Sequence, residues 1–123
     1  MLQLSKKFKN YDINCSAIKM GNDFTISIYG GDIPHIGAVA LGIPRPSLQD
    51  INKISSSVSL LTITGHKEDI IAQNCAKKLS SKLNSTIVVS CGIHIKDITF
   101  EDIQGLNSTV DDLINDLITS LKN

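Results

Sequence analysis

The sequence predicts an α+β fold in which a mainly antiparallel sheet of about five strands carries two long helices on one face. Two kinds of periodicity support this. Residues 24–29 alternate apolar and polar side chains with the period of a half-buried strand, and residues 107–122 carry a continuous apolar stripe with the period of a helix. At 123 residues, the chain has the length of one domain, spanning residues 1–123.

The first half of the chain is predicted to be mostly strand. Residues 1–10 read as a short polar lead-in, and residues 13–20 and 24–31 form a hairpin around the turn sequence Gly-Asn-Asp. Residues 35–42 form a third strand. The two prolines of "IPRPS" then predict a loop over residues 43–55, with a short helical turn near residues 48–51.

The second half adds two strands and two helices. Residues 57–64 are rich in β-branched side chains, and the apolar run at residues 85–95 predicts a central strand. Between them, residues 65–84 carry a helical stripe, which Asn84 can close. Residues 99–103 predict one helical turn, and the last helix starts separately at residue 107, capped by Ser108 or Thr109.

Composition restricts the classes of function. Twelve acidic residues balance twelve basic ones, which disfavours nucleic acid and anionic membranes as partners. Three widely spaced cysteines indicate a reducing compartment rather than a disulfide framework, and no apolar run approaches the ~20 residues of a membrane span. We therefore expect a cytoplasmic protein. No hydrolase, nucleotide-binding or Rossmann motif is present.

The three histidines, His35, His66 and His94, each stand near a glycine and beside a strand. Each has an ordinary structural explanation: a strand-start histidine bonded to a carbonyl, a helix cap and a core histidine. Strand ends commonly rim ligand sites, so we expect the three rings to converge on one pocket.

Other residues could complete such a site. Gly37 would let a ligand approach the backbone, and His66 with Lys67 would offer a helix start to an anion, although the two acids that follow would oppose it. Arg45 could grip a phosphate from its proline-rich segment. A zinc site is the weaker alternative because the histidines lack metal-site spacing, so no metal ligand is assigned.

The ordered motifs "GDIPHIGAVAL", "GHKED" and "CGIHIKDIT" resemble the prenylated-flavin chaperone family, the small accessory subunit of gallate-type, UbiD-like decarboxylases. The likeness covers about residues 25–103. Its motifs fall on three stretches of the chain: Pro34, His35 and Gly37; Gly65, His66 and Lys67; Gly92 and His94.

The resemblance implies a fold like that of proteasome-assembly-chaperone modules, which often form dimers. It also implies a non-catalytic protein that binds prenylated FMN, or FMN, as cargo and assists maturation of a UbiD-like decarboxylase. On our interpretation, aliphatic strand ends cover the flavin ring system, and His35 and His94 give it polar contacts. His66, Lys67 and Arg45 would hold the phosphate.

Two alternatives remain open at this stage. The protein could be a small enzyme that uses His35, His66 and His94 as metal ligands or one of them as a general base. It could instead be a pure assembly module, which docks a decarboxylase without binding a small ligand.

Overall fold

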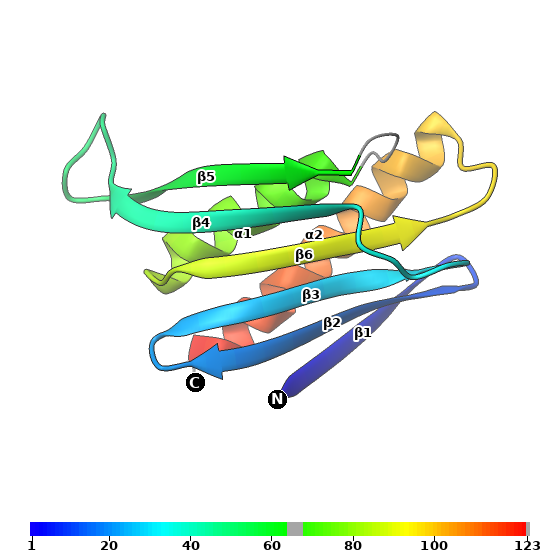
Figure 1. Ribbon diagram of the computed structural model, residues 1–123, viewed down its shortest axis with the longest axis horizontal. Helices are drawn as coiled ribbons and strands as arrows, with labels where there is room; N and C mark the ends of the chain where they lie inside the picture. The colour runs from blue at the N-terminus through cyan, green and yellow to red at the C-terminus, as the bar shows by residue number, and fades with distance from the viewer. Residues whose placement is uncertain (64–67, 123) are drawn as a thin grey trace.

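Six strands and two helices make up the described part of the chain, residues 1–63 and 68–122 of a computed structural model (Figure 1). The helices lie together on one face of a single sheet, and the other face is open. The elements are β1 Leu2–Phe8, β2 Tyr11–Met20, β3 Asp23–Gly31, β4 Ala38–Pro46, β5 Ile54–Thr62, α1 Asp69–Leu83, β6 Ile87–His94 and α2 Phe100–Lys122. The predicted α+β class is confirmed, with one strand more than expected.

The strand order is β1-β2-β3-β6-β4-β5, so β6 is inserted between β3 and β4. Its pairing with β3 is parallel, and the other four strand pairings are antiparallel. Because β3 and β4 are not neighbours, residues 32–37 must cross the end of β6 to join them. This crossing creates the end of the sheet where the candidate site lies.

The core lies between the sheet and the helices. Each central strand turns every second side chain toward α1 and α2, the pattern that an apolar sheet face requires. The largest fully buried side chains include Ile13, Ile26, Ile28, Ile87 and Val89 of the sheet and Leu79, Leu113, Ile114 and Leu117 of the helices. The predicted central position of the strand near residues 85–95 is therefore confirmed.

The prediction of a polar lead-in over residues 1–10 is wrong, because β1 pairs with β2 along its whole length. Lys6 stands at a position where the alternating pattern of a strand calls for an apolar residue, so the sequence does not look like a strand. Lys6 is on the helix side, where its ammonium nitrogen lies 3.0 Å from the Asp116 carboxylate of α2. A lysine can occupy such a position because its apolar stem packs while its charged end reaches the surface.

The expected loop over residues 43–55 is also shorter than predicted. β4 continues to Pro46 and β5 begins at Ile54, and no helix forms between them. β4 pairs with β6 only as far as Gly42, so Pro44 and Pro46 lie where β4 has a neighbour on one side only. Proline is tolerated there because fewer backbone N–H groups are needed for the ladder.

The last helix is one element, not a turn followed by a separate helix. Its start is capped at Thr99 and Asp102. The Thr99 hydroxyl accepts a hydrogen bond from the Asp102 N–H at 3.1 Å, and the Asp102 carboxylate accepts one from the Thr99 N–H at 3.4 Å. Gly105 lies inside the helix, where a Cβ atom would stand 2.9 Å from the Phe8 ring. This glycine makes room for β1 rather than ending a helix.

The preceding helix, α1, begins at Asp69, and Asn84 closes it in the left-handed conformation at φ 49°, as predicted. Neither helix in the described part of the chain combines the length and hydrophobicity needed to cross a membrane.

Candidate functional site

Two of the three predicted histidines come together at the end of the sheet where β3 and β6 finish. His94 is the last residue of β6, and His35 lies in the connection that crosses it. Their ring centroids are 6.3 Å apart, with the planes at 74°. The crossing is fixed by backbone hydrogen bonds on both sides, from the Asp32 N–H to the His94 carbonyl at 2.6 Å and from the Gly37 N–H to the Cys91 carbonyl at 2.8 Å.

His35 is held by an acid that the sequence does not single out. Its Nε2 lies 2.8 Å from Oε1 of Glu68, and its Nδ1 lies 3.1 Å from the Ile33 carbonyl oxygen. The Ile33 carbonyl can only accept, so a hydrogen bond to it requires an N–H on Nδ1. The Nε2 contact with Glu68 is an ion pair when the ring carries both protons, and an O–H···N hydrogen bond when the proton lies on the carboxyl group. The Glu68 side chain is 7% exposed and that of His35 is 19% exposed. His35 and Glu68 therefore form a largely buried histidine–carboxyl pair.

Two glycines allow these groups to approach the backbone. A Cβ atom at Gly37 would lie 2.6 Å from Cδ of the Glu68 carboxylate, and one at Gly92 would overlap the His35 carbonyl. Gly37 therefore makes room for Glu68, and not for a ligand as expected from the sequence. Gly92 makes room for the crossing of residues 32–37 over β6.

A pocket of about 440 Å³ opens beside His94, between the end of β6 and the starts of both helices. Its walls are mainly apolar, and Glu68, His94 and Asn107 supply the polar groups. The apolar lining consists of Ile70, Ile71, Ile93, Ile95, Ile98, Phe100, Ile103 and Leu106. Pockets for small ligands have volumes of roughly 300–1,000 Å³ and this combination of apolar walls with a few convergent polar groups.

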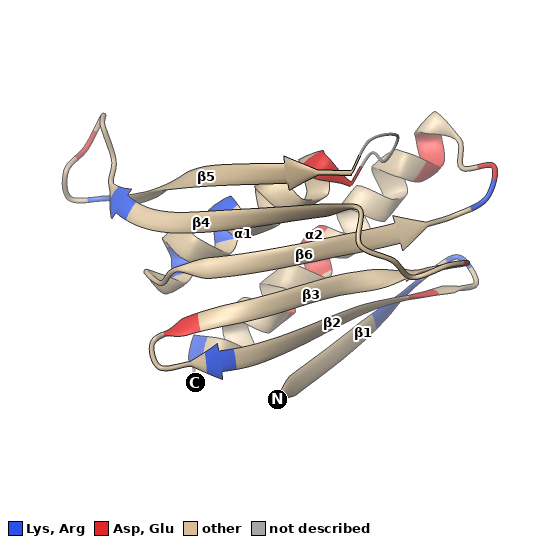
Figure 2. Ribbon diagram, in the orientation of Figure 1, with Lys and Arg blue, Asp and Glu red and all other residues tan. Residues whose placement is uncertain are grey.

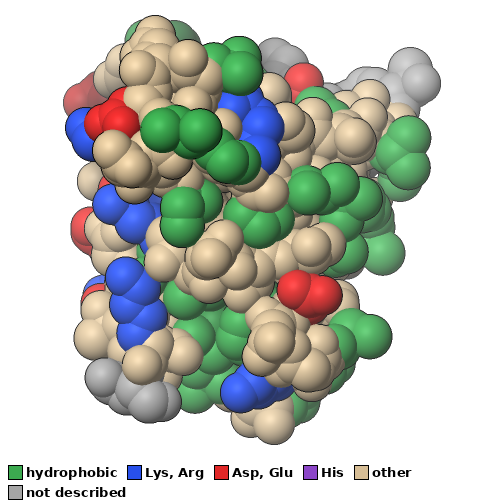
Figure 3. Space-filling view, turned by 90° about the vertical axis from the view of Figure 1, so that its left-hand side faces the viewer, with side chains coloured by type: hydrophobic (Ala, Val, Ile, Leu, Met, Phe, Trp, Pro, Cys, Tyr) green, Lys and Arg blue, Asp and Glu red, His purple; other side chains and the backbone are tan. Residues whose placement is uncertain are grey.

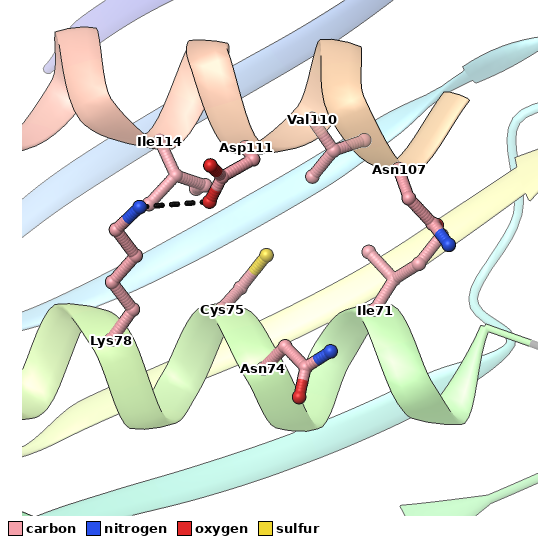
Figure 4. Close-up of a pocket in the computed structure, with 8 residues that line it drawn as sticks. All are labelled: Ile71, Asn74, Cys75, Lys78, Asn107, Val110, Asp111 and Ile114. Carbon is pink, nitrogen blue, oxygen red and sulfur yellow. Dashed lines mark hydrogen bonds and ion pairs between the residues drawn. The ribbon is translucent and has the colours of Figure 1, made fainter. Parts of the chain in front are cut away.

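A second pocket, of about 340 Å³, lies between α1 and α2 (Figure 4). Cys75 points into it, and a Lys78–Asp111 ion pair of 2.8 Å joins the two helices at one end. Ile71 and Asn107 line both pockets, so the two are neighbours. The pocket beside His94 is the better candidate site because polar groups from three segments converge on it.

The cysteines do not supply a nucleophile. Cys15, Cys75 and Cys91 are all buried. Burial raises the pKa of Cys15 to about 12, and burial together with the nearby Glu68 carboxylate raises that of Cys91 to about 12. Burial also raises the pKa of Cys75. Thiols with such pKa values stay protonated and unreactive at neutral pH.

Arg45 does not join this site. It lies near the far end of β4, paired with Ser55 of β5, and its Nε donates to the Ser57 hydroxyl at 2.8 Å. About ten residues of extended chain separate it from His35, which corresponds to roughly 30 Å. The expectation that Arg45 acts with the histidines is not supported, because the strand carries it to the opposite end of the sheet.

His66 and Lys67 lie outside the described residues, so the predicted convergence of three rings is seen for His35 and His94 alone. Within the described ranges, no group of three or more His, Cys, Asp or Glu side chains is arranged to hold a metal ion. The sequence predicted a pocket at the strand ends, but not that Glu68 would pair with His35 or that both helix starts would form the apolar wall. The available signal for Glu68 was an acid one residue before the helix begins, which is also an ordinary feature of helix starts.

The fold and this site define a class of protein: an α+β domain that presents a ligand-sized apolar pocket beside a buried histidine–carboxylate pair. Residues 7–122 match the prenylated flavin chaperone LpdD-like domain, and the chain belongs to this family. The resemblance found in the sequence motifs is thereby confirmed.

Individual relatives agree with this assignment. Protein LpdD of Lactiplantibacillus plantarum is 28% identical over 103 residues, which cover 84% of this chain and 72% of the relative. The crystal structure of a chaperone complex for yeast 20S proteasome assembly contains a similar chain, with a TM-score of 0.50 and 11% identity, covering 91% of this chain and 96% of that one. This likeness supports the predicted fold.

Proposed function

We propose that the protein is a non-catalytic chaperone that binds prenylated FMN and assists the maturation of a UbiD-like decarboxylase. The observation that carries this proposal is the apolar pocket beside His94 in a chain of the prenylated flavin chaperone family. The buried, protonated cysteines support a carrier without turnover, because they remove three otherwise reactive groups from the neighbourhood of the cargo.

The pocket fits the ring system of prenylated FMN better than it fits the phosphate. Aliphatic walls such as Ile93, Ile95 and Ile98 would cover the apolar ring system, and the exposed His94 side chain would contact its polar edge. In contrast, Glu68 places a carboxylate in the wall, and a carboxylate repels a phosphate. The phosphate therefore belongs outside the pocket.

His35 takes a different role from the one that its sequence position suggests. Both of its ring nitrogens face acceptors within the protein, so it orients the site rather than offering a polar contact to the flavin. His66 and Lys67 remain the proposed phosphate contacts from the sequence, and Arg45 is removed from this set because of its position.

Titration with flavin tests the proposal directly. We expect a saturable change in flavin absorbance with prenylated FMN, and a weaker one with FMN, which lacks the added ring. His94→Ala should weaken binding by about 2- to 10-fold, the loss of one hydrogen bond, and His66→Ala should also weaken it. Arg45→Ala is the matched control and should bind like the parent protein. A folded protein that gives no saturable change with either flavin contradicts the proposal.

We further propose that the open face of the sheet pairs with a second copy of the chain. Side chains on this face of β2, β3, β6 and β4 include no acid and no lysine between residues 14–18, 25–29, 88–92 and 39–43 (Figure 2). Ile18 and Ile43 are about half exposed there, at 49% and 47%, and hydrophobic side chains emerge along the open-face side of Figure 3. Depletion of charge is typical of interface centres.

The size of this face is compatible with a dimer. Six strands about 4.8 Å apart, paired over about seven residues, give a projected area of roughly 550 Å², and accessible area is larger than projected area. A stable interface buries roughly 800 Å² per partner. A neutral surface also meets its own copy without charge repulsion, which favours the homodimer as the occupant.

A further inference from the structure

Five exposed apolar side chains lie at the end of the sheet that holds the pocket, and two of them, Ile70 and Phe100, also line it. These side chains come from the crossing segment, the end of β5 and the first residues of both helices, which all meet at one end of the sheet (Figure 1). They are Ile33 at 61% exposure, Ile36 at 58%, Ile63 at 50%, Ile70 at 60% and Phe100 at 76%. Large apolar side chains exposed together at one end of a molecule indicate a surface that contacts another molecule.

The same end of the molecule is acidic, although the chain as a whole is neutral. The described segments here carry three lysines and seven carboxylates, and two of the lysines are already paired, Lys7 with Asp12 at 2.9 Å and Lys9 with Asp102 at 2.6 Å. The third lysine is Lys96, and the other carboxylates are Asp32, Glu68, Asp69, Asp97 and Glu101. The opposite end carries most of the other cations, including Arg45, Lys53, Lys77 and Lys82, so the charges are separated along the sheet (Figure 2).

From this geometry we propose that the apolar and acidic rim is the surface that docks the recipient decarboxylase, with the phosphate of the cargo turned outward toward it. This inference rests on the proposed function. A protein that finally holds a phosphate-bearing flavin must present cations at its own site, and such a basic rim complements the acidic rim described here. The carboxylates of this rim oppose the hold of the proposed contacts His66 and Lys67 on the phosphate, and so favour its transfer.

Charge selects this partner over other occupants. Two copies of the chain meeting at this end would bring the same carboxylates together, which is unfavourable. An anionic membrane would be repelled for the same reason. A decarboxylase surface with an apolar centre and surrounding lysine and arginine residues would pack against the exposed isoleucines and pair with the acids.

Docking is tested with the apo form of a UbiD-like decarboxylase and the full chain, without flavin. Ile33→Ser combined with Ile36→Ser removes apolar side chains that do not line the pocket, so cargo binding should be unchanged. We expect affinity for the decarboxylase to fall about tenfold or more. The matched control is Leu48→Ser with Ile51→Ser, which alters two side chains of 91% and 79% exposure in the β4–β5 loop and should change affinity less than about twofold.

The charge contribution is tested with Asp97→Asn combined with Glu101→Gln. Asp97 has φ 58°, a conformation that asparagine also adopts, so this pair removes charge with little change in shape. We expect several-fold slower association at low ionic strength and a weaker dependence on salt. Asp50→Asn with Asp112→Asn, in the β4–β5 loop and on the exposed side of α2, is the control and should leave association unchanged.

The outcomes separate the two proposals. If the isoleucine pair and its control bind the decarboxylase equally well while flavin binding is intact, the docking surface is wrong and the chaperone function stands. If no variant binds flavin but the isoleucine pair alone loses the decarboxylase, the docking surface stands and the flavin cargo is wrong. Folding of each variant is checked by its far-ultraviolet circular dichroism and thermal midpoint.

Discussion

The His35–Glu68 pair should be energetically coupled, and a double-mutant cycle measures this. The variants are His35→Ala, Glu68→Gln and the double substitution. In the parent protein the 2.8 Å contact joins a side chain of 19% exposure to one of 7% exposure, so solvent screens it little. A hydrogen bond between charged groups in such surroundings contributes about 1.5–3 kcal/mol.

The expected magnitudes follow from burial. His35→Ala leaves the Glu68 side chain buried without its imidazole partner, and should lower the free energy of unfolding by about 2–4 kcal/mol. Glu68→Gln keeps the shape and removes the charge, so its cost should be smaller, about 1–2 kcal/mol. The double variant should lose less than the sum of the two single variants by about 1–2 kcal/mol, because the contact can be lost only once.

Urea unfolding followed by circular dichroism provides the assay, since the chain contains no tryptophan. A coupling energy below about 0.5 kcal/mol would refute the pairing of His35 with Glu68 and leave His35 as a separate surface-packed ring. Lys7→Ala with Asp12→Asn is a control cycle on an exposed pair, with side chains of 68% and 59% exposure, and its coupling should be small.

Three further predictions concern the helix start, the thiols and the open face. Thr99→Ala should cost about 1 kcal/mol of stability in the same unfolding assay because it removes the helix cap, whereas Ser108→Ala, inside the helix, should not destabilise. Ellman's reagent should find no rapidly reacting thiol until denaturant is added. Folding raises the pKa of Cys91 to about 12, above the usual thiol value of about 8.5. The contribution of this thiol to the free energy of unfolding should therefore be fully present below about pH 8.5 and decrease as the pH rises toward about 12. The decrease should be less steep in Cys91→Ala. Leu41→Lys, on the open face, should convert a dimer to a monomer in light scattering; an unchanged mass would contradict the proposed pairing.

The flavin and docking proposals share a physical requirement, because a carrier must bind its cargo and also release it. The apolar pocket can retain the ring system, while the carboxylates near its mouth oppose retention of the phosphate. An affinity set by these opposing effects would be moderate. Transfer would then be favoured by a recipient whose site presents more cations than carboxylates.

Most secondary structure could be predicted from the sequence because it depends on local patterns. The hairpin of β2 and β3, the strand character of β4, β5 and β6, and the closure of α1 at Asn84 all follow from alternation, turn residues and a left-handed cap. The two errors near the chain ends have tertiary causes. Lys6 fits β1 because α2 supplies Asp116, and Gly105 fits α2 because the Phe8 ring occupies the space of a side chain.

The sequence by itself determined the fold class, the family motifs and the closeness of His35 and His94 to strand ends, since each is written in short-range patterns. Only the tertiary structure decided that β6 lies between β3 and β4, and this insertion brings residue 35 over residue 92 and beside His94. It also decided that Glu68 binds His35 and that Arg45 lies at the other end of the sheet. These are consequences of strand order and direction, which join residues far apart in the chain and leave no local signal.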